Sequence, residues 1–143
     1  MRWKKVIKIS WLSLFFMILL RALIFADEAS AVREEVHLTI SSQIEAFKKN
    51  DVEEAYTFAA PNIQAQFPNP ETFGLMVRNG YPTIWKPKSF KFAKFKDLGD
   101  KCIQRVLFQS YSGSLETYDY ILEKNNNLWK IAGVLTINSA DET

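Results

Sequence analysis

The spacing of apolar positions changes along the chain, from a helical period before residue 81 to a strand-like alternation after residue 88. Within residues 31–49, apolar residues recur every three or four positions and so fall on one stripe of a helix. The stripe consists of Val32, Val36, Ile40, Ile44 and Phe47. We therefore expect an amphipathic first helix over Ala31–Lys49, which Asn50 and Asp51 terminate.

Two short helical segments should follow. Asp51 and Glu54 are spaced as a capping box, in which each side chain bonds the backbone N–H of the other residue. This pair predicts a second helix that begins at Val52. Pro61 ends that helix and opens a short helical turn that runs through Phe67.

Asn69 and Pro70 predict the start of a third helix, because Asn is a favoured cap and Pro a favoured first residue. Its apolar residues Phe73, Met76 and Val77 should face inward. Gly80 should close it in a left-handed conformation. Tyr81, which precedes Pro82, should be extended.

Four segments alternate as β-strands and are separated by short polar turns, which indicates antiparallel hairpins. The segments are residues 89–96, 102–111, 115–124 and 128–137. Gly133 predicts a bend or bulge within the last one. Helices followed by a meander predict an α+β fold, with N-terminal helices packed on a curled four-stranded antiparallel sheet.

Alternation also predicts which side chains share a face of the sheet. In the first strand, Phe90 and Phe92 should lie on one face and Phe95 on the other. The third strand should place Tyr118, Tyr120 and Leu122 together, and the fourth Trp129, Ile131 and Leu135.

Residues 1–26 have the order of a secretory signal peptide. A basic start is followed by an apolar run over residues 9–20, Arg21, and the small residue Ala26. We expect cleavage after Ala26, with Ala31 as a second site, and a single exported domain over residues 27–138 with a tail over 139–143. The protein would then be periplasmic or secreted. An uncleaved anchor over residues 6–26, in the inner membrane, is the alternative and the one route to membrane contact.

The charge distribution gives no reason to expect nucleic-acid binding. The first 26 residues hold five basic side chains and no acidic one. Removing these five from the 18 basic residues leaves 13 against 16 acidic residues, a net charge of −3. A weakly negative domain without a basic run lacks the electrostatic footprint of a nucleic-acid partner.

Few residues offer enzyme or metal chemistry. Cys102 is the single cysteine and lies in a strand pattern, where a buried thiol behaves as a small apolar residue. His37 is the single histidine, and we expect it on the surface of the first helix. One His and one Cys do not suffice for a transition-metal site without several carboxylates, so we expect no metal and no cofactor.

The order of elements resembles the nuclear-transport-factor-2-like (cystatin-like) superfamily, whose fold is a cone with one open end. The chain from about Val32 to Leu135 is also similar to an exported bacterial family of domains of unknown function, serial number 4864. The residues that carry this resemblance are 46–47, Asp51, 55–59, Pro61, Ile63, Phe67, Phe73, 76–78, 80–82 and Pro87. No activity is established for that family, so the resemblance implies a fold and not a reaction.

The cone fold implies a cavity between sheet and helices, and six residues are candidates to bind a ligand there. They are Tyr56, Met76, Tyr81, Trp85, Arg105 and Tyr118. Five of them have a structural alternative: core packing for Tyr56 and Tyr118, a lid over the helices for Tyr81 and Trp85, and a cross-strand ion pair with Asp119 for Arg105.

We expect a non-catalytic domain that binds a small apolar ligand or an envelope protein. One alternative is an isomerase or hydrolase that uses Tyr56 or Tyr118 with Asp119, which requires the phenol and the carboxylate to meet. The neighbouring positions of Tyr118 and Asp119 on one strand argue against this pairing. Another alternative is a homodimer joined through the open face of the sheet.

Overall fold

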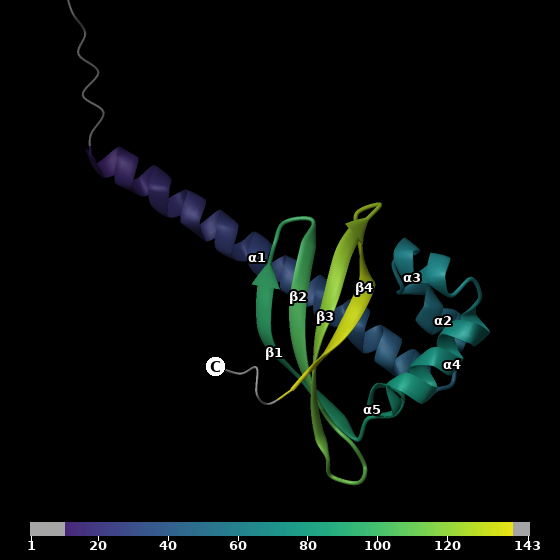
Figure 1. Cartoon of the computed structure of the whole chain (residues 1–143). Helices are drawn as coiled ribbons and strands as arrows, with labels where there is room; N and C mark the ends of the chain where they lie inside the picture. Colours follow the sequence, from purple (N-terminus) through teal and green to yellow (C-terminus); the bar gives the residue numbers. More distant parts are fainter. Residues whose placement is uncertain (1–10, 139–143) are drawn as a thin grey trace, which may run out of the picture. The chain divides into compact units, whose positions relative to one another are not determined.

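A computed structural model describes residues 11–138 of the chain (Figure 1). It divides into two compact units, Met1–Val32 and Arg33–Thr143. The basic start of the predicted signal peptide and the predicted tail 139–143 lie outside the described residues.

Helix α1 (Trp11–Lys48) begins twenty residues before the predicted first helix and ends one residue before its predicted end. Residues 11–30 contain no Gly or Pro, so no residue there interrupts a helix. Within residues 11–138, no helix is both long enough and apolar enough to span a bilayer.

The short helices α2 (Val52–Thr57) and α3 (Pro61–Gln66) follow as predicted. The Asp51 side chain accepts a hydrogen bond from the Glu54 backbone N–H at 2.9 Å, which confirms half of the predicted capping box. The reciprocal bond is not made, because the Asp51 N–H donates instead to the Ala46 carbonyl at 2.9 Å. Asp51 thus closes α1 and opens α2.

Helix α4 (Pro70–Gly80) starts as expected, with the Asn69 side chain accepting from the Thr72 N–H at 2.8 Å. The predicted left-handed conformation of Gly80 is wrong. Among the described glycines, positive φ angles occur at Gly99 and Gly113. The chain instead turns at Tyr81, which has a φ of −136°, and helix α5 (Pro82–Trp85) begins at once.

The sheet is a four-stranded antiparallel meander with strand order β1-β2-β3-β4, as predicted (Figure 1). Its strands are β1 (Ser89–Asp97), β2 (Lys101–Gln109), β3 (Leu115–Asn125) and β4 (Leu128–Ile137). Asn126 and Asn127 both have positive φ angles in the last hairpin, where Asn tolerates the left-handed region.

Two bulges change which side chains share a face. In β1 the register shifts between Phe92 and Phe95, so Phe95 lies on the same face as Phe92 and the predicted opposition is wrong. In β4 the register shifts beside Gly133, as predicted, but this moves Leu135 to the outer face. Leu135 is 55% exposed and pairs with Asp119. A simple alternation of two cannot anticipate the extra residue of a bulge.

The core lies between the inner face of the sheet and residues 33–48 of α1. Val36, Ile40, Ile44 and Phe47 are fully buried, as the helical stripe predicts. The buried side chains on the inner face of β2, β3 and β4 are Cys102, Gln104, Val106, Phe108, Tyr118, Tyr120, Leu122, Trp129 and Ile131.

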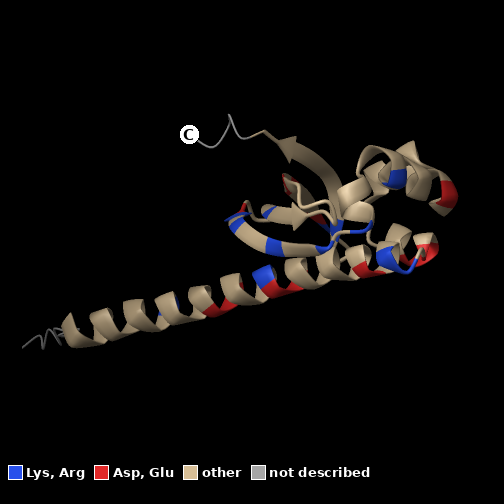
Figure 2. Cartoon of the chain, turned by 90° about the horizontal axis from the view of Figure 1, so that it is seen from below, with Lys and Arg blue, Asp and Glu red and all other residues tan. Residues whose placement is uncertain are grey.

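The two edges of the sheet differ. On one edge, Ile131 of β4 forms a parallel bridge with Ala59, and its N–H donates to the Phe58 carbonyl at 2.8 Å. On the other edge, β1 carries the exposed lysines Lys91, Lys94 and Lys96 (Figure 2).

The predicted surface position of His37 is wrong. Its ring stacks on Phe92 with 3.8 Å between centroids, and its Nε2 lies 2.9 Å from Oε1 of the buried Gln104. The Gln104 amide also donates to the Arg105 carbonyl at 2.8 Å. His37 therefore joins α1 to the sheet. Among the described residues, no cluster of His, Cys, Asp or Glu could hold a metal ion.

Candidate functional site

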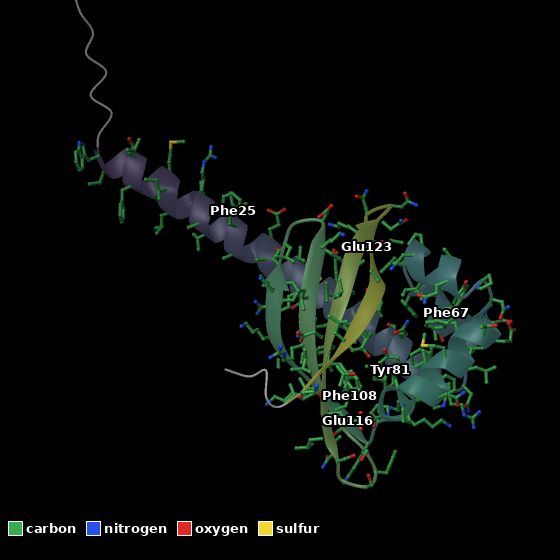
Figure 3. All side chains as sticks on the ribbon, in the orientation of Figure 1. Phe25, Phe67, Tyr81, Phe108, Glu116 and Glu123 are labelled. Atoms are coloured by element: carbon green, nitrogen blue, oxygen red, sulfur yellow. The ribbon has the colours of Figure 1, made fainter. Side chains whose placement is uncertain are left out.

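A cavity of about 270 Å³ lies between the helices and the inner face of β3 and β4. Phe67 and Tyr81, both labelled in Figure 3, line it from the helical side. The remaining lining residues are Gln43, Phe47, Ala59, Ile63, Gln66, Phe73, Met76, Val77, Ile84, Tyr120, Ile131, Gly133 and Val134. Most of these side chains are apolar or aromatic, which is typical of ligand pockets.

Helix α4 supplies one wall of the cavity. Phe73, Met76 and Val77 are three and four positions apart, so they point to one side of the helix. This confirms their predicted inward orientation. Gly74, next to this stripe, allows a close approach to α2, because a Cβ at this position would lie 2.5 Å from Val52 Cγ1.

Strand β4 supplies the opposite wall through its bulge. Past the register shift, Val134 pairs with Tyr120 and lines the cavity, whereas Leu135 faces outward. Gly133 also lines the cavity. The bulge therefore selects which β4 side chains reach the site.

Tyr120 brings a polar group to this apolar site. Its side chain is fully buried, and its hydroxyl has no hydrogen-bond partner among residues 11–138. Burial raises the pKa of Tyr120 well above its usual value, and the neighbouring phenols Tyr118 and Tyr81 add to the effect. The phenol is therefore neutral at any physiological pH and can donate a hydrogen bond.

Gln43 is the second buried polar residue that lines the cavity, with 4% of its surface exposed. Its Nε2 donates to the Ala55 carbonyl at 3.1 Å, which holds the amide in place. Its position on α1, three residues after Ile40, would normally be apolar. That interruption of the stripe was the sequence signal for this residue, and our sequence analysis missed it.

Of the six predicted ligand-binding residues, the structure brings Met76 and Tyr81 to the cavity. Tyr56 does not line it: its hydroxyl donates to the Phe67 carbonyl at 2.6 Å, and its ring packs on Phe73. Trp85 is buried elsewhere, with its ring 5.2 Å from that of Phe47.

Tyr118 and Arg105 also lie outside the cavity lining. The Tyr118 hydroxyl donates to Glu116 Oε2, and its ring packs edge-on against Tyr81 at 5.9 Å. Burial, followed by the bond to Glu116, raises the pKa of Tyr118. Arg105 lies on the outer face, where its Nε donates to Asp119 at 2.8 Å and its Nη2 at 3.0 Å. This is the predicted cross-strand pair.

The Tyr and Asp pair of the enzyme alternative does not meet. Tyr118 is on the inner face of β3 and Asp119 on the outer face, bound to Arg105. The hydroxyl of Tyr56 is bonded to a backbone carbonyl. The described residues that line the cavity include phenols but no carboxylate, so they offer no such pair within hydrogen-bond reach of one point.

Comparison with known proteins identifies the family and the fold. The model of the domain of unknown function DUF4864 matches residues 29–143, and the chain belongs to this family. An NTF-2-like protein of unknown function from Shewanella oneidensis MR-1 has a similar structure, with a TM-score of 0.50 and 13% sequence identity. The similarity covers 74% of this chain and 98% of that one. At this identity it shows a shared α+β, NTF-2-like fold. No curated protein matches the chain.

Proposed function

We propose that this member of the DUF4864 family binds a small, largely apolar ligand in the cavity between its helices and its sheet, without catalysis. The observation that carries the proposal is the aromatic and aliphatic lining of the cavity, which the bulge of β4 and the stripe of α4 build together. The NTF-2-like fold is compatible with such a role.

The size of the cavity supports a ligand of modest dimensions. Its volume of about 270 Å³ is near the lower limit of drug-sized pockets, which begin at about 300 Å³. An apolar cavity of about 150 Å³ in another protein accommodates benzene. We therefore expect a single ring with short substituents, or a short alkyl chain.

A binding role agrees better with the site than a catalytic role does. Catalysis by general acid and base needs groups with suitable pKa values near the substrate. Among the described residues, the cavity instead presents two phenols, Tyr81 and Tyr120, two amides, Gln43 and Gln66, and apolar side chains, and burial raises the pKa of Tyr120.

The proposal can be tested by titrating the full chain with toluene and following amide chemical shifts. We expect saturable shifts in α4 and β4. Met76→Trp should abolish them, because the larger side chain fills the cavity. Leu75→Trp is the matched control, since Leu75 is 58% exposed on the same helix and does not line the cavity. Absence of saturable binding, or equal loss in both variants, would contradict the proposal.

We also propose that the protein acts outside the cytoplasm after cleavage behind Ala26. The basic start, the apolar run and the small residue support this. The family match begins at residue 29, so such cleavage keeps the matched region whole. Sequencing the N-terminus of protein isolated from cell fractions should give Asp27 as the first residue. A first residue of Met1 would contradict cleavage.

A further inference from the structure

The polar groups around the cavity indicate the kind of ligand it takes. Two buried side-chain atoms lack a hydrogen-bond partner among residues 11–138, the Tyr120 hydroxyl and the Trp129 Nε1. Only Tyr120 of these two belongs to the cavity lining. An unsatisfied buried donor is costly, so a native structure that keeps one calls for an explanation.

Phenylalanine would fill the same space as Tyr120 without that cost. The neighbouring tyrosines show the contrast: the Tyr118 hydroxyl donates to Glu116 and the Tyr56 hydroxyl to the Phe67 carbonyl. A purely apolar ligand would leave the Tyr120 hydroxyl unsatisfied. A ligand with an acceptor atom would complete it.

The charge of the ligand is restricted as well. None of the described residues that line the cavity is Asp, Glu, Lys, Arg or His. A carboxylate or an ammonium group in this lining would be buried without an opposite charge, which is strongly unfavourable. An uncharged hydroxyl or carbonyl group needs only a hydrogen-bond partner.

We propose, on the basis of the proposed binding function, that the ligand carries one uncharged oxygen that accepts a hydrogen bond from the Tyr120 hydroxyl. The chemical class is a small aromatic or aliphatic alcohol or ketone, and it excludes carboxylic acids and amines in their ionised forms. Tyr120 is then a specificity-determining residue, because it separates this class from hydrocarbons of the same shape.

The test uses four probes with one carbon skeleton: toluene, benzyl alcohol, benzoate and benzylamine, titrated at pH 7 into the full chain. Benzyl alcohol should bind about threefold to tenfold tighter than toluene, the range that one net hydrogen bond gives. Benzoate and the protonated amine should bind at least about tenfold more weakly than benzyl alcohol.

Tyr120→Phe should keep the affinity for toluene and remove the preference for benzyl alcohol. The matched control is Tyr118→Phe, two residues along the same face, whose hydroxyl already has a partner and which does not line the cavity. It should keep the preference. If Tyr120→Phe does not fold, the ratios of the four probes on the unmodified chain still decide.

The outcomes separate the two proposals. Benzoate or benzylamine binding as tightly as benzyl alcohol, or an unchanged preference in Tyr120→Phe, would overturn the inference about ligand class and leave the binding function intact. Toluene binding without any preference for benzyl alcohol would do the same. If no probe binds, the binding function and the ligand class both fail.

Discussion

The two faces of the sheet differ in whether their polar side chains have hydrogen-bond partners. On the outer face, Arg105 and Asp119 sit on neighbouring strands and satisfy each other through two hydrogen bonds of 2.8 and 3.0 Å. On the inner face, Tyr120 is fully buried and its hydroxyl has no partner among residues 11–138. The charged pair on the outer face is therefore satisfied, whereas the neutral hydroxyl on the inner face is the group without a described partner.

The difference shows that the contacts of a side chain, more than its chemical type, decide whether its polar atoms already have a hydrogen-bond partner. Arg105 and Asp119 carry full charges, and each is already paired with the other. Nothing in the sequence distinguishes Tyr120, and its contacts in the fold leave its hydroxyl without a partner among residues 11–138.

The largest expected contrast between the faces is in packing. Leu122 is fully buried on the inner face, so Leu122→Ala should lower the free energy of unfolding by about 2–5 kcal/mol. Leu107 is 42% exposed on the outer face, and Leu107→Ala should change the free energy of unfolding by no more than about 0.5 kcal/mol. Urea denaturation followed by circular dichroism measures both. Similar losses would show that the outer face is also packed.

Alkaline pH should lower the stability of the fold through the buried thiol of Cys102 on the inner face. Burial, together with the charge of Asp97, raises the pKa of Cys102 from 9.0 to about 12. Above pH 9 the unfolded chain loses this proton while the folded chain keeps it, so stability present below pH 9 is lost progressively up to pH 12. For this thiol alone the loss of stability at pH 10 is on the order of 1 kcal/mol.

Denaturation curves between pH 8 and pH 10 measure this slope, with Cys102→Ala as the comparison. The variant should lose less stability over that interval because it has no thiol to ionise. Tyr118 and Tyr120 also have raised pKa values and are present in both proteins, so their contribution cancels. Identical slopes in the two proteins would contradict the prediction.

Two tyrosines on the inner face should respond differently to loss of the hydroxyl. Tyr118→Phe removes the bond to Glu116 and should lower the free energy of unfolding by about 1 kcal/mol. Tyr120→Phe removes a hydroxyl without a described partner, so stability should stay unchanged or rise slightly in the absence of ligand. Thermal unfolding of both variants is the measurement. A larger loss of stability for Tyr120→Phe than for Tyr118→Phe would mean that the Tyr120 hydroxyl, and not that of Tyr118, has the stabilising partner.

The smallest effect should come from the outer ion pair. A double-mutant cycle with Arg105→Ala and Asp119→Ala should give a coupling energy of about 0.5–1 kcal/mol. Lys48 and Glu45 form a more exposed pair on α1 and should couple by only a few tenths, about 0.3 kcal/mol. Equal coupling in the two cycles would mean that partial burial adds nothing to the outer pair.

Much of the fold followed from local patterns in the sequence. The stripe of α1, the caps at Asp51 and Asn69, and the four alternating strands predicted elements that the structure confirms. These features depend on spacing and on neighbouring residues, which a single sequence displays directly.

The candidate site was harder to predict because it depends on which face of the sheet each side chain points to and on which group each hydroxyl bonds. The bulge beside Gly133 was expected, but its effect of turning Leu135 outward was not. Tyr56 and Tyr118 were plausible ligand residues until the structure showed their hydroxyls bonded to Phe67 and Glu116. Which of several tyrosines stays unpaired is set by contacts between distant segments.

The unequal edges of the sheet have a consequence for association between copies of the chain. An edge strand presents unpaired backbone groups that can template a strand from another molecule. At β4 the segment around Ala59 occupies part of that edge through its bridge to Ile131. At β1 the lysines and the bulge make a foreign strand a poor fit, by charge repulsion and by a broken register. One edge of the sheet is thus covered in part by the chain itself, and the other edge carries positive charge. Both features oppose the growth of fibrils by edge-to-edge pairing.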